Sequence, residues 1–271
     1  MNHFEFAFTN IDEIQKDALI ALLADIGFTG FEENDESLKA FIGENNFNEL
    51  EFNAVLKQMS VAAAKTIIPA KNWNANWESS YEPVMVDDFA IVRASFHSPV
   101  KNVQHEIIIT PKMSFGTGHH ATTYLMMQQM KGIDFSNTSA LDFGTGTGIL
   151  AILAEKLGAA NITAIDNDEW SIENAAENIA NNHCTKISLS QADIIPAEKK
   201  FDIILANINL NVITAAMPSI QNVAAENCII LLSGFLSTDE KAIAALIADA
   251  GFTLNSISAK NNWLCVQCTT N

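Results

Sequence analysis

The first 68 residues alternate between the hydrophobic periodicities of strands and helices. Phenylalanine alternates with other residues over residues 4–8, which predicts a half-buried strand. A helix is predicted next, because apolar residues recur at helical spacing at Ile14, Ala18, Leu22 and Ile26. Asn10 and Glu13 resemble a capping box at its start, and Gly27 stands where it would end.

Two strand-like segments, residues 28–33 and 38–42, follow this helix. A second helix is predicted over residues 48–65, and a last strand begins at residue 67. The inward-facing side chains predicted for the second helix include Leu50, Ala54 and Met59. The order βαββαβ fits a small ferredoxin-like α+β domain over residues 1–68. Because this domain shows no catalytic motif, we expect it to serve recognition or packing.

Residues 69–85 form a polar segment with widely spaced aromatic residues. This composition is typical of a linker between two domains. Trp73 and Trp77 lie four positions apart, where they would pin the linker to a neighbouring surface or serve ordinary packing between domains.

The last predicted domain spans residues 86–271, and residues 89–96 and 106–110 are its first predicted strands. From residue 140 onward, strand patterns at 140–143, 162–165, 187–189, 201–206 and 229–232 alternate with glycine turns and helical runs. This alternation predicts a doubly wound, mostly parallel α/β sheet. Residues 253–259 and 263–268 are joined by only three residues, so these two strands must be antiparallel. A Rossmann-like sheet closed by a C-terminal antiparallel hairpin is the layout of class I methyltransferases.

The strongest local motif is the run LDFGTGTGIL, in which a strand leads through three alternate glycines into a helix. Gly144, Gly146 and Gly148 lack a Cβ, so a ligand can approach the backbone closely. The helix start adds free N–H groups and the positive end of the helix dipole. The nicotinamide fingerprint GxGxxG would require glycine at 149, where Ile149 stands. The motif therefore favours the methyltransferase form GxGxG, with a ligand-free tight turn as the alternative.

Acidic residues follow the next two strands. Asp166 lies 22 positions after Gly144, and an acid at about this offset accepts hydrogen bonds from both hydroxyls of a ribose. Asp168 is an alternative for this role, although it is also placed to cap the following helix. Asp193, after the third strand, is placed either near the amino group of an adenine or at the surface.

Asn207 ends the fourth strand of the sheet, at the edge where ligands bind. Enzymes that methylate amides or bases often carry Asn-Pro-Pro-Tyr here, but neither proline nor an aromatic residue follows Asn207. Its carbonyl oxygen would orient an accepting amine, with a loop cap as the alternative role.

The run FGTGHHATT, residues 115–123, is a second glycine-rich turn that leads into a helix. Thr122 and Thr123 are placed to cap that helix or to present hydroxyls to a ligand. His119 and His120 are adjacent and therefore point apart, which makes them a poor metal pair. We expect structural or lid roles for both, with a general base as the alternative.

The composition narrows the class of protein. The apolar fraction of 48% is enough for a sizeable core, while 15 basic residues against 32 acidic ones give a net charge of −17. Because Arg93 is the only arginine, a nucleic-acid binder is disfavoured, and the acidic surface either attracts basic partners or maintains solubility.

Cys265 and Cys268 form a lone CxxC whose side chains would point to opposite faces of a strand, so we expect no metal site. With neither a signal peptide nor a long apolar run, we expect a cytoplasmic protein without membrane attachment.

Taken together, these motifs resemble the bacterial ribosomal protein L11 methyltransferases over essentially the whole chain. The paired linker tryptophans, the loop FGTGxHxTT and the glycine turn occur in the order typical of that family. Ala121 departs from the pattern, since proline is usual there, and this loosens the start of the helix. The resemblance implies that S-adenosyl-L-methionine (AdoMet) is bound by Phe115, Thr123, Gly144, Gly146, Asp166 and Asn207. It assigns the catalytic position to Asn207, whereas Asn209 lies in a variable segment and inherits no role.

The resemblance also implies a reaction and a substrate. The chain would be a monomeric, AdoMet-dependent protein N-methyltransferase acting on lysine ε-amines and the N-terminal α-amine of the basic ribosomal protein L11. No sequence-specific contact with nucleic acid is expected. The alternatives are a methyltransferase of the same fold with another protein, an RNA or a small molecule as substrate, and a non-catalytic AdoMet-binding module. Ile149 disfavours a nicotinamide oxidoreductase.

Overall fold

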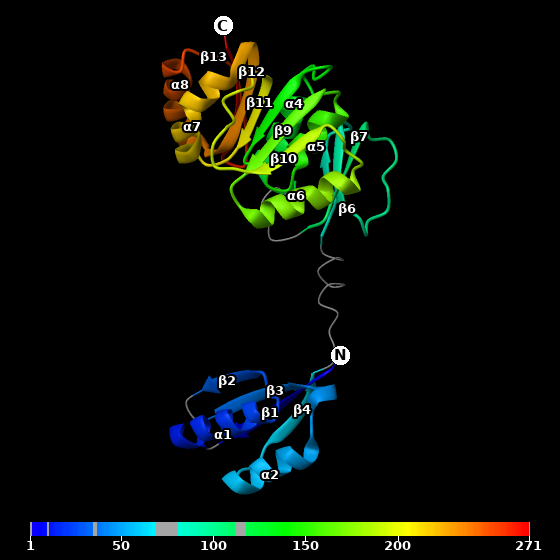
Figure 1. Cartoon of the computed structure of the whole chain (residues 1–271), viewed down its shortest axis with the longest axis vertical. Coiled ribbons are helices and arrows are strands. Elements are labelled where there is room, and N and C mark those ends of the chain that lie inside the picture. Colours follow the sequence, from blue (N-terminus) through cyan, green and yellow to red (C-terminus); the bar gives the residue numbers. More distant parts are fainter. Residues whose placement is uncertain (1, 10, 35–36, 69–80, 112–117, 271) are drawn as a thin grey trace. The chain divides into compact units, whose positions relative to one another are not determined.

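The computed structural model describes residues 2–9, 11–34, 37–68, 81–111 and 118–270. The chain divides into two compact units, residues 1–80 and 81–271 (Figure 1). The predicted linker, with Trp73 and Trp77, falls largely outside the described residues. Val84 and Met85, which were assigned to that linker, instead belong to a strand of the second unit.

The first unit is an antiparallel sheet with two helices, and its described strands follow the order β2-β3-β1-β4. Its elements are β1 (His3–Thr9), α1 (Glu13–Asp25), β2 (Gly30–Asn34), β3 (Ser37–Gly43), the short 3-10 helix η1 (Glu44–Asn46), α2 (Glu49–Met59) and β4 (Ala64–Ile68). Strand order and direction are those of a ferredoxin-like fold, which confirms the prediction for this part of the chain.

The core of this unit is built on the alternating phenylalanines of β1. Phe4, Phe6 and Phe8 are buried, as the period of two predicted. Phe6 packs on Phe52 of α2 with ring centroids 4.2 Å apart. The aromatic cluster therefore joins the central strand to the second helix.

The predicted start of α1 is wrong, and its predicted apolar series is only partly buried, since Leu22 and Ile26 pack against the core of this unit and Ile14 does not. The capping box is formed by Asp12 and Gln15, whose side chains each accept a hydrogen bond from the other's backbone N–H, and not by Asn10 and Glu13. The side chains that this helix buries are Lys16, Leu19 and Leu23. Ile14 is 81% exposed. Apolar residues occupy two neighbouring stripes of α1, and packing against the sheet, rather than periodicity, selects between them.

The second helix is shorter than predicted. Helix α2 ends at Met59, where Ser60 adopts a left-handed conformation with φ of 51°, and not at residue 65. Residues 64–68 instead form strand β4, which pairs with β1. Leu50 is 83% exposed because it lies on the side of α2 opposite the aromatic cluster; Phe52 and Val55 face inward.

The second unit is built around a large sheet whose described strands follow the order β10-β9-β8-β11-β12-β14-β13. These strands are β8 (Ser139–Phe143), β9 (Asn161–Asp166), β10 (Ile187–Gln191), β11 (Phe201–Asn207), β12 (Ala224–Leu236), β13 (Thr253–Lys260) and β14 (Trp263–Thr269). All neighbours are parallel except β14, which runs antiparallel to both β12 and β13. The predicted class I methyltransferase layout is confirmed.

Helices cover both faces of this sheet (Figure 1). The helical elements are α4 (Ala121–Met130), α5 (Ile149–Lys156), α6 (Glu169–Asn181), α7 (Leu210–Val223), the 3-10 helix η2 (Ser237–Asp239) and α8 (Glu240–Asp249). Helices α4 and α5 share one hydrophobic cluster with a small sheet of β5 (Val84–Val86), β6 (Ala90–Ala94) and β7 (His105–Ile109). Helices α7 and α8 form a second cluster on the opposite face.

Cys265 and Cys268 belong to these two different clusters. Both thiols are buried, and this burial raises the pKa of each to about 12. The two side chains therefore point to opposite faces of β14, as their spacing predicted. No helix in the described part of the chain has both the length and the apolar character needed to cross a membrane.

Candidate functional site

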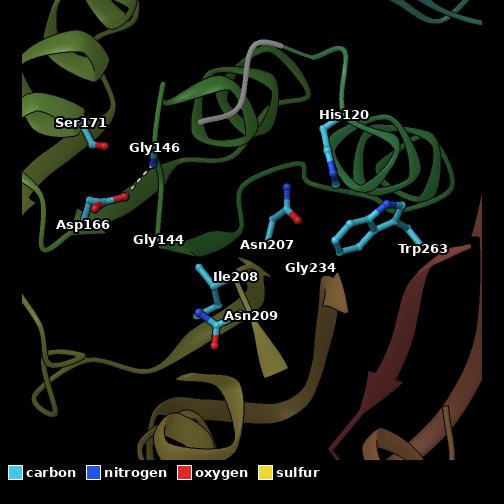
Figure 2. A pocket seen from close by; sticks show the side chains of 10 residues that line it. All are labelled: His120, Gly144, Gly146, Asp166, Ser171, Asn207, Ile208, Asn209, Gly234 and Trp263. Atoms are coloured by element: carbon cyan, nitrogen blue, oxygen red, sulfur yellow. Dashed lines mark hydrogen bonds between the residues drawn. The ribbon is translucent and has the colours of Figure 1, made fainter. Parts of the chain in front are cut away.

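A cavity of about 390 Å³ opens at the carboxyl ends of the parallel strands (Figure 2). Its lining comes from β9, β11, β12 and β14, from the glycine turn after β8 and from the starts of α4, α6 and α7; it comprises His120, Gly144, Gly146, Asp166, Ser171, Asn207, Ile208, Asn209, Gly234 and Trp263. A second cavity of about 270 Å³ adjoins it, with Gly144, Asp166, Ile208 and Asn209 in common. The site therefore lies where ligands bind in open α/β sheets.

The glycine turn between β8 and α5 forms one wall of the first cavity. The backbone N–H groups of Gly144 and Thr145 both donate to the carbonyl of Ile165, at 2.9 Å, so the turn rests on the end of β9. Gly144 borders both cavities and has φ of +74°, a conformation that other residues rarely adopt.

Ile208, which follows Asn207, is held between two glycines. A Cβ at Gly144 would overlap the side chain of Ile208, and a Cβ at Gly234 would overlap its backbone. The Ile208 N–H also donates to the carbonyl of Ser233 at 3.1 Å. The path of the chain immediately after Asn207 is thereby fixed by its neighbours on both sides.

Asp166 lies at the end of β9 and borders both cavities. One of its oxygens accepts the Gly146 N–H at 2.9 Å, and the other accepts the Asp168 N–H at 3.1 Å. Each carboxylate oxygen has a second lone pair, so Asp166 retains the capacity to accept ribose hydroxyls. Asp168 instead caps α6, since its Oδ2 accepts the N–H and the hydroxyl of Ser171, both at 2.9 Å.

We expect Asp166→Asn to weaken AdoMet binding by about 5- to 30-fold, because a charged acceptor for the ribose hydroxyls becomes neutral, a loss of roughly 1–2 kcal/mol. Calorimetric titration with AdoMet measures the effect. Asp168→Asn is the matched control, since asparagine caps helices as well as aspartate does. A larger loss of affinity in the Asp168 variant would transfer the ribose role to Asp168.

Asn207 presents a buried, unpartnered oxygen to the first cavity. The residue is 9% exposed, and its Nδ2 donates to the hydroxyl of Thr123 at 3.3 Å. Within the described part of the chain, its Oδ1 has no hydrogen-bond partner. Leaving a buried acceptor unpaired costs about 1–3 kcal/mol, so such an atom at a cavity points to a ligand as its partner.

Thr123 holds the side-chain amide of Asn207 in place. It is fully buried on α4, and the described lining of the cavity does not include it. Its hydroxyl receives the amide N–H of Asn207, which directs the amide oxygen toward the cavity. A direct contact of Thr123 with AdoMet remains a prediction.

His120 and Trp263 form the wall farthest from Asp166 (Figure 2). Their rings meet edge to face, with centroids 4.5 Å apart. His120 also caps α4, because its Nδ1 faces the N–H of Thr122 at 3.4 Å and the hydroxyl of Thr122 at 2.7 Å. Partial burial lowers the pKa of His120 and favours the neutral ring.

The residues around this wall differ in part from the prediction. Helix α4 begins at Ala121 with His120 as its cap, rather than at residue 124 with a threonine cap. His119 points elsewhere, with its Nε2 2.9 Å from the carbonyl of Glu82. Trp263 was identified only as the start of a strand. Its place at the site follows from the pairing of β14 with β12, which no local motif reveals.

Asp193 and Phe115 complete the set of predicted residues. Asp193 borders the second cavity beside Phe143 and Val212 and is exposed, so both alternatives given for it, a place near the adenine and a place at the surface, stay open. Phe115 falls outside the described residues.

Asp142 is a buried carboxyl group beneath the glycine turn that the sequence analysis did not single out. Its Oδ2 accepts the Thr145 hydroxyl at 2.6 Å and the Ala151 N–H at 3.1 Å. These bonds join β8, the glycine turn and α5. Burial raises the pKa of Asp142 from its ordinary 3.8 to about 6.

This raised pKa predicts a pH-dependent stability. Between about pH 4 and pH 6 the folded chain holds the Asp142 proton and the unfolded chain does not, so the free energy of unfolding falls as pH rises. The loss amounts to roughly 3 kcal/mol across this window, at about 1.4 kcal/mol per unit. Urea unfolding of the wild type and of Asp142→Asn at pH 4 and pH 7 should show the variant gaining relative stability at pH 7. Parallel pH profiles would contradict this.

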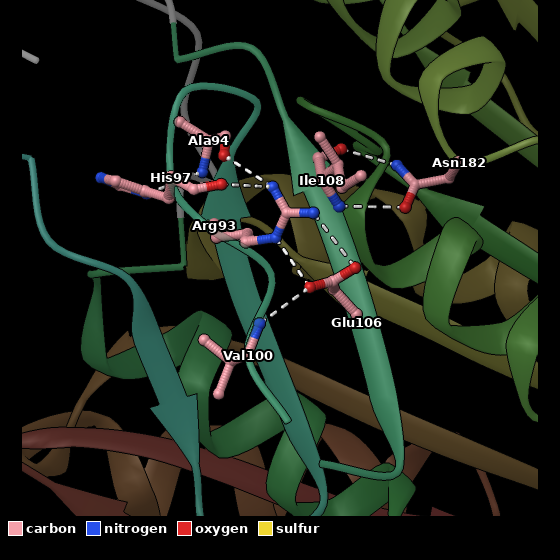
Figure 3. A network of polar contacts seen from close by, with 7 residues as sticks. All are labelled: Arg93, Ala94, His97, Val100, Glu106, Ile108 and Asn182. Carbon is pink, nitrogen blue, oxygen red and sulfur yellow. Dashed lines mark hydrogen bonds and ion pairs between the residues drawn. The ribbon is translucent and has the colours of Figure 1, made fainter. Parts of the chain in front are cut away.

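Arg93, the only arginine of the chain, is used inside the second unit (Figure 3). It is 5% exposed and donates to both oxygens of Glu106, at 2.7 and 3.1 Å. It also donates to the carbonyls of Ala94 and His97. Arg93 lowers the pKa of Glu106 through this ion pair. The guanidinium therefore fastens β6 to β7 and is not exposed for contact with a phosphate.

The chain as a whole is similar to known proteins. The family model of the ribosomal protein L11 methyltransferase (PrmA) matches residues 12–271. The chain is 38% identical over 265 residues to the ribosomal protein L11 methyltransferase of Porphyromonas gingivalis, covering 95% of this chain and 91% of that protein. It is 39% identical over 276 residues to that of Chlorobaculum tepidum, covering 97% and 95% respectively.

A solved structure is also similar. The ribosomal protein L11 methylase of Lactobacillus delbrueckii subsp. bulgaricus superposes with a TM-score of 0.66 at 27% identity. The match covers 70% of this chain and all of that one.

Proposed function

Since the chain belongs to the ribosomal protein L11 methyltransferase family, we propose that it methylates the lysine ε-amines and the N-terminal α-amine of ribosomal protein L11. Methyl transfer from AdoMet is the reaction of this family and its fold. The choice of amines as acceptors rests on the site, above all on the unpartnered oxygen of Asn207.

The described residues fit AdoMet in their chemistry. Gly144 borders both cavities without a side chain, and Asp166 offers two carboxylate oxygens to ribose hydroxyls. Asp193 borders the adjoining cavity, where an adenine would reach it. Bound there, AdoMet supplies a methyl group on a positively charged sulfur.

The residues of the chain have to position a neutral amine and exclude water. The Oδ1 of Asn207 accepts a hydrogen bond from the amine N–H, which leaves the nitrogen lone pair directed at the methyl group. His120 and Trp263 shield the same end of the cavity. Alignment of this kind lowers a barrier by roughly 7–11 kcal/mol, so the reaction needs no strong base.

The first unit has the character of a recognition domain. Its hydrophobic cluster is its own, and the cofactor-site residues all lie in the second unit. We assign residues 1–68 to recognition of the ribosomal protein and the second unit, residues 81–271, to AdoMet binding and catalysis, with a linker between them. The net charge of −17 suits a basic substrate, and a ribosomal substrate implies a cytoplasmic enzyme.

Incubation with methyl-labelled AdoMet and purified L11 tests this function. We expect label on lysine side chains and on the N-terminal amine, located by mass spectrometry of L11 peptides. Label on ribosomal RNA or on a small molecule would overturn the proposed substrate. Binding of AdoMet without any transfer would identify a non-catalytic module.

A further inference from the structure

We propose that a third cavity, beyond Trp263, is the entry site for the substrate lysine and binds the basic polypeptide segment around it. This inference rests on the proposed function, since it concerns how an amine reaches Asn207. The cavity measures about 320 Å³ and shares Asn209, Gly234 and Trp263 with the AdoMet cavity.

The order of the three cavities along the strand ends indicates which of them hold AdoMet and which admits the acceptor amine. Asp166 and Asp193, at the ends of β9 and β10, serve the ribose and adenine parts of AdoMet. Figure 2 shows Asn207 between the glycine turn and Trp263, with Asp166 on the far side of that turn. The third cavity continues past Trp263 toward β12 and η2. An acceptor entering from this end meets Asn207 without crossing the space needed by AdoMet.

The lining of the third cavity suits the stem of a lysine. Leu236 lies opposite Trp263 in the antiparallel pairing of β12 and β14, and it is 42% exposed. The indole and the leucine side chain together form an apolar floor at the junction of the two cavities. Four methylene groups of a lysine can pack on such a floor while the amine passes inward.

Asp239 supplies the charge that selects a basic segment. Its carboxylate is held by the Leu236 N–H at 2.9 Å, beside the apolar floor. Among the described residues that line this cavity, Asp239 is charged and none is a lysine or arginine. A basic side chain near the target lysine would therefore find an opposite charge at the entrance, whereas a phosphate backbone would be repelled.

Asp239→Asn tests the proposal, because asparagine keeps an acceptor for the Leu236 N–H and removes only the charge. We expect the KM for L11 to rise about three- to tenfold, with kcat and AdoMet affinity unchanged. The matched control is Asp249→Asn, which removes the same charge from the exposed opposite end of α8. The rise in KM should shrink at high salt, since the Asp239 side chain is only half-buried.

Equal KM values for the two variants would overturn the entry site. The proposed function fails separately, if the wild type transfers no methyl group to L11. To keep the two apart, calorimetry measures L11 binding to each variant saturated with S-adenosylhomocysteine. Weaker binding by Asp239→Asn than by Asp249→Asn supports the entry site even without turnover, and equal binding by both overturns it.

Discussion

Asn207→Ala is expected to lower kcat by about 5- to 150-fold at saturating AdoMet. The variant removes a buried oxygen at the end of β11 that has no hydrogen-bond partner among the residues that the structure describes. A lost positioning hydrogen bond corresponds to roughly 1–3 kcal/mol of barrier, which gives this range. Single-turnover methylation of L11, beside calorimetric titration with AdoMet, separates the loss in rate from any loss in affinity.

The same two measurements decide what Asn207 contacts. If it contacts only AdoMet, affinity and kcat/KM fall together and kcat recovers at saturating AdoMet, contrary to our expectation. Thr123→Val is an informative companion, because it removes the hydroxyl that accepts the Asn207 N–H and leaves the amide in place. We expect it to lower kcat as well, but by less than Asn207→Ala.

A fragment of residues 81–271 is expected to bind AdoMet normally and to lose methylation of L11. The second unit contains its own hydrophobic clusters on both faces of its sheet, so the fragment retains its core. The cluster of the first unit, built on Phe4, Phe6 and Phe8, is separate. If that unit recognises L11, its removal takes away substrate binding and leaves the chemical site unchanged.

Methylation of L11 and AdoMet affinity are therefore measured on the fragment and on the full chain in parallel. A fragment that methylates L11 at the rate of the full chain would refute a recognition role for the first unit. A fragment that no longer binds AdoMet would show that the second unit depends on the first, against the separate cores.

The sequence alone predicted those features that depend on local pattern. Alternating phenylalanines predicted β1, and the three-residue connection after β13 predicted the antiparallel hairpin, since no crossover fits into it. The 22-residue offset singled out Asp166, which the structure places beside the glycine turn, where it accepts the Gly146 N–H; its contact with the ribose stays a prediction. The strand and the hairpin were predicted correctly because each depends on residues close in sequence.

The same reasoning failed where packing had to choose between equivalent patterns. In α1 two neighbouring apolar stripes satisfied the helical period, and contact with the sheet buried Leu19 and Leu23 and left Ile14 in solvent. Residues 60–65 continue the helical pattern of α2, but the helix ends before Ser60, and residues 64–68 form strand β4 instead. The spacing of apolar residues indicates that a helix forms, but it does not indicate which face of the helix packs against the sheet.

The sequence by itself determined the two domain types, the glycine turn, the acidic residue at the end of β9 and the family. Only the tertiary structure decided which side chains share the site. Trp263 and Gly234 share the cavity with Asn207 because β11, β12 and β14 are successive neighbours in the sheet, and Thr123 meets the Asn207 amide from α4. Asp142 acquires its raised pKa from burial beneath the turn. The physical reason is that a cavity is formed by side chains distant along the chain, and their meeting depends on strand order and packing, which no local pattern encodes.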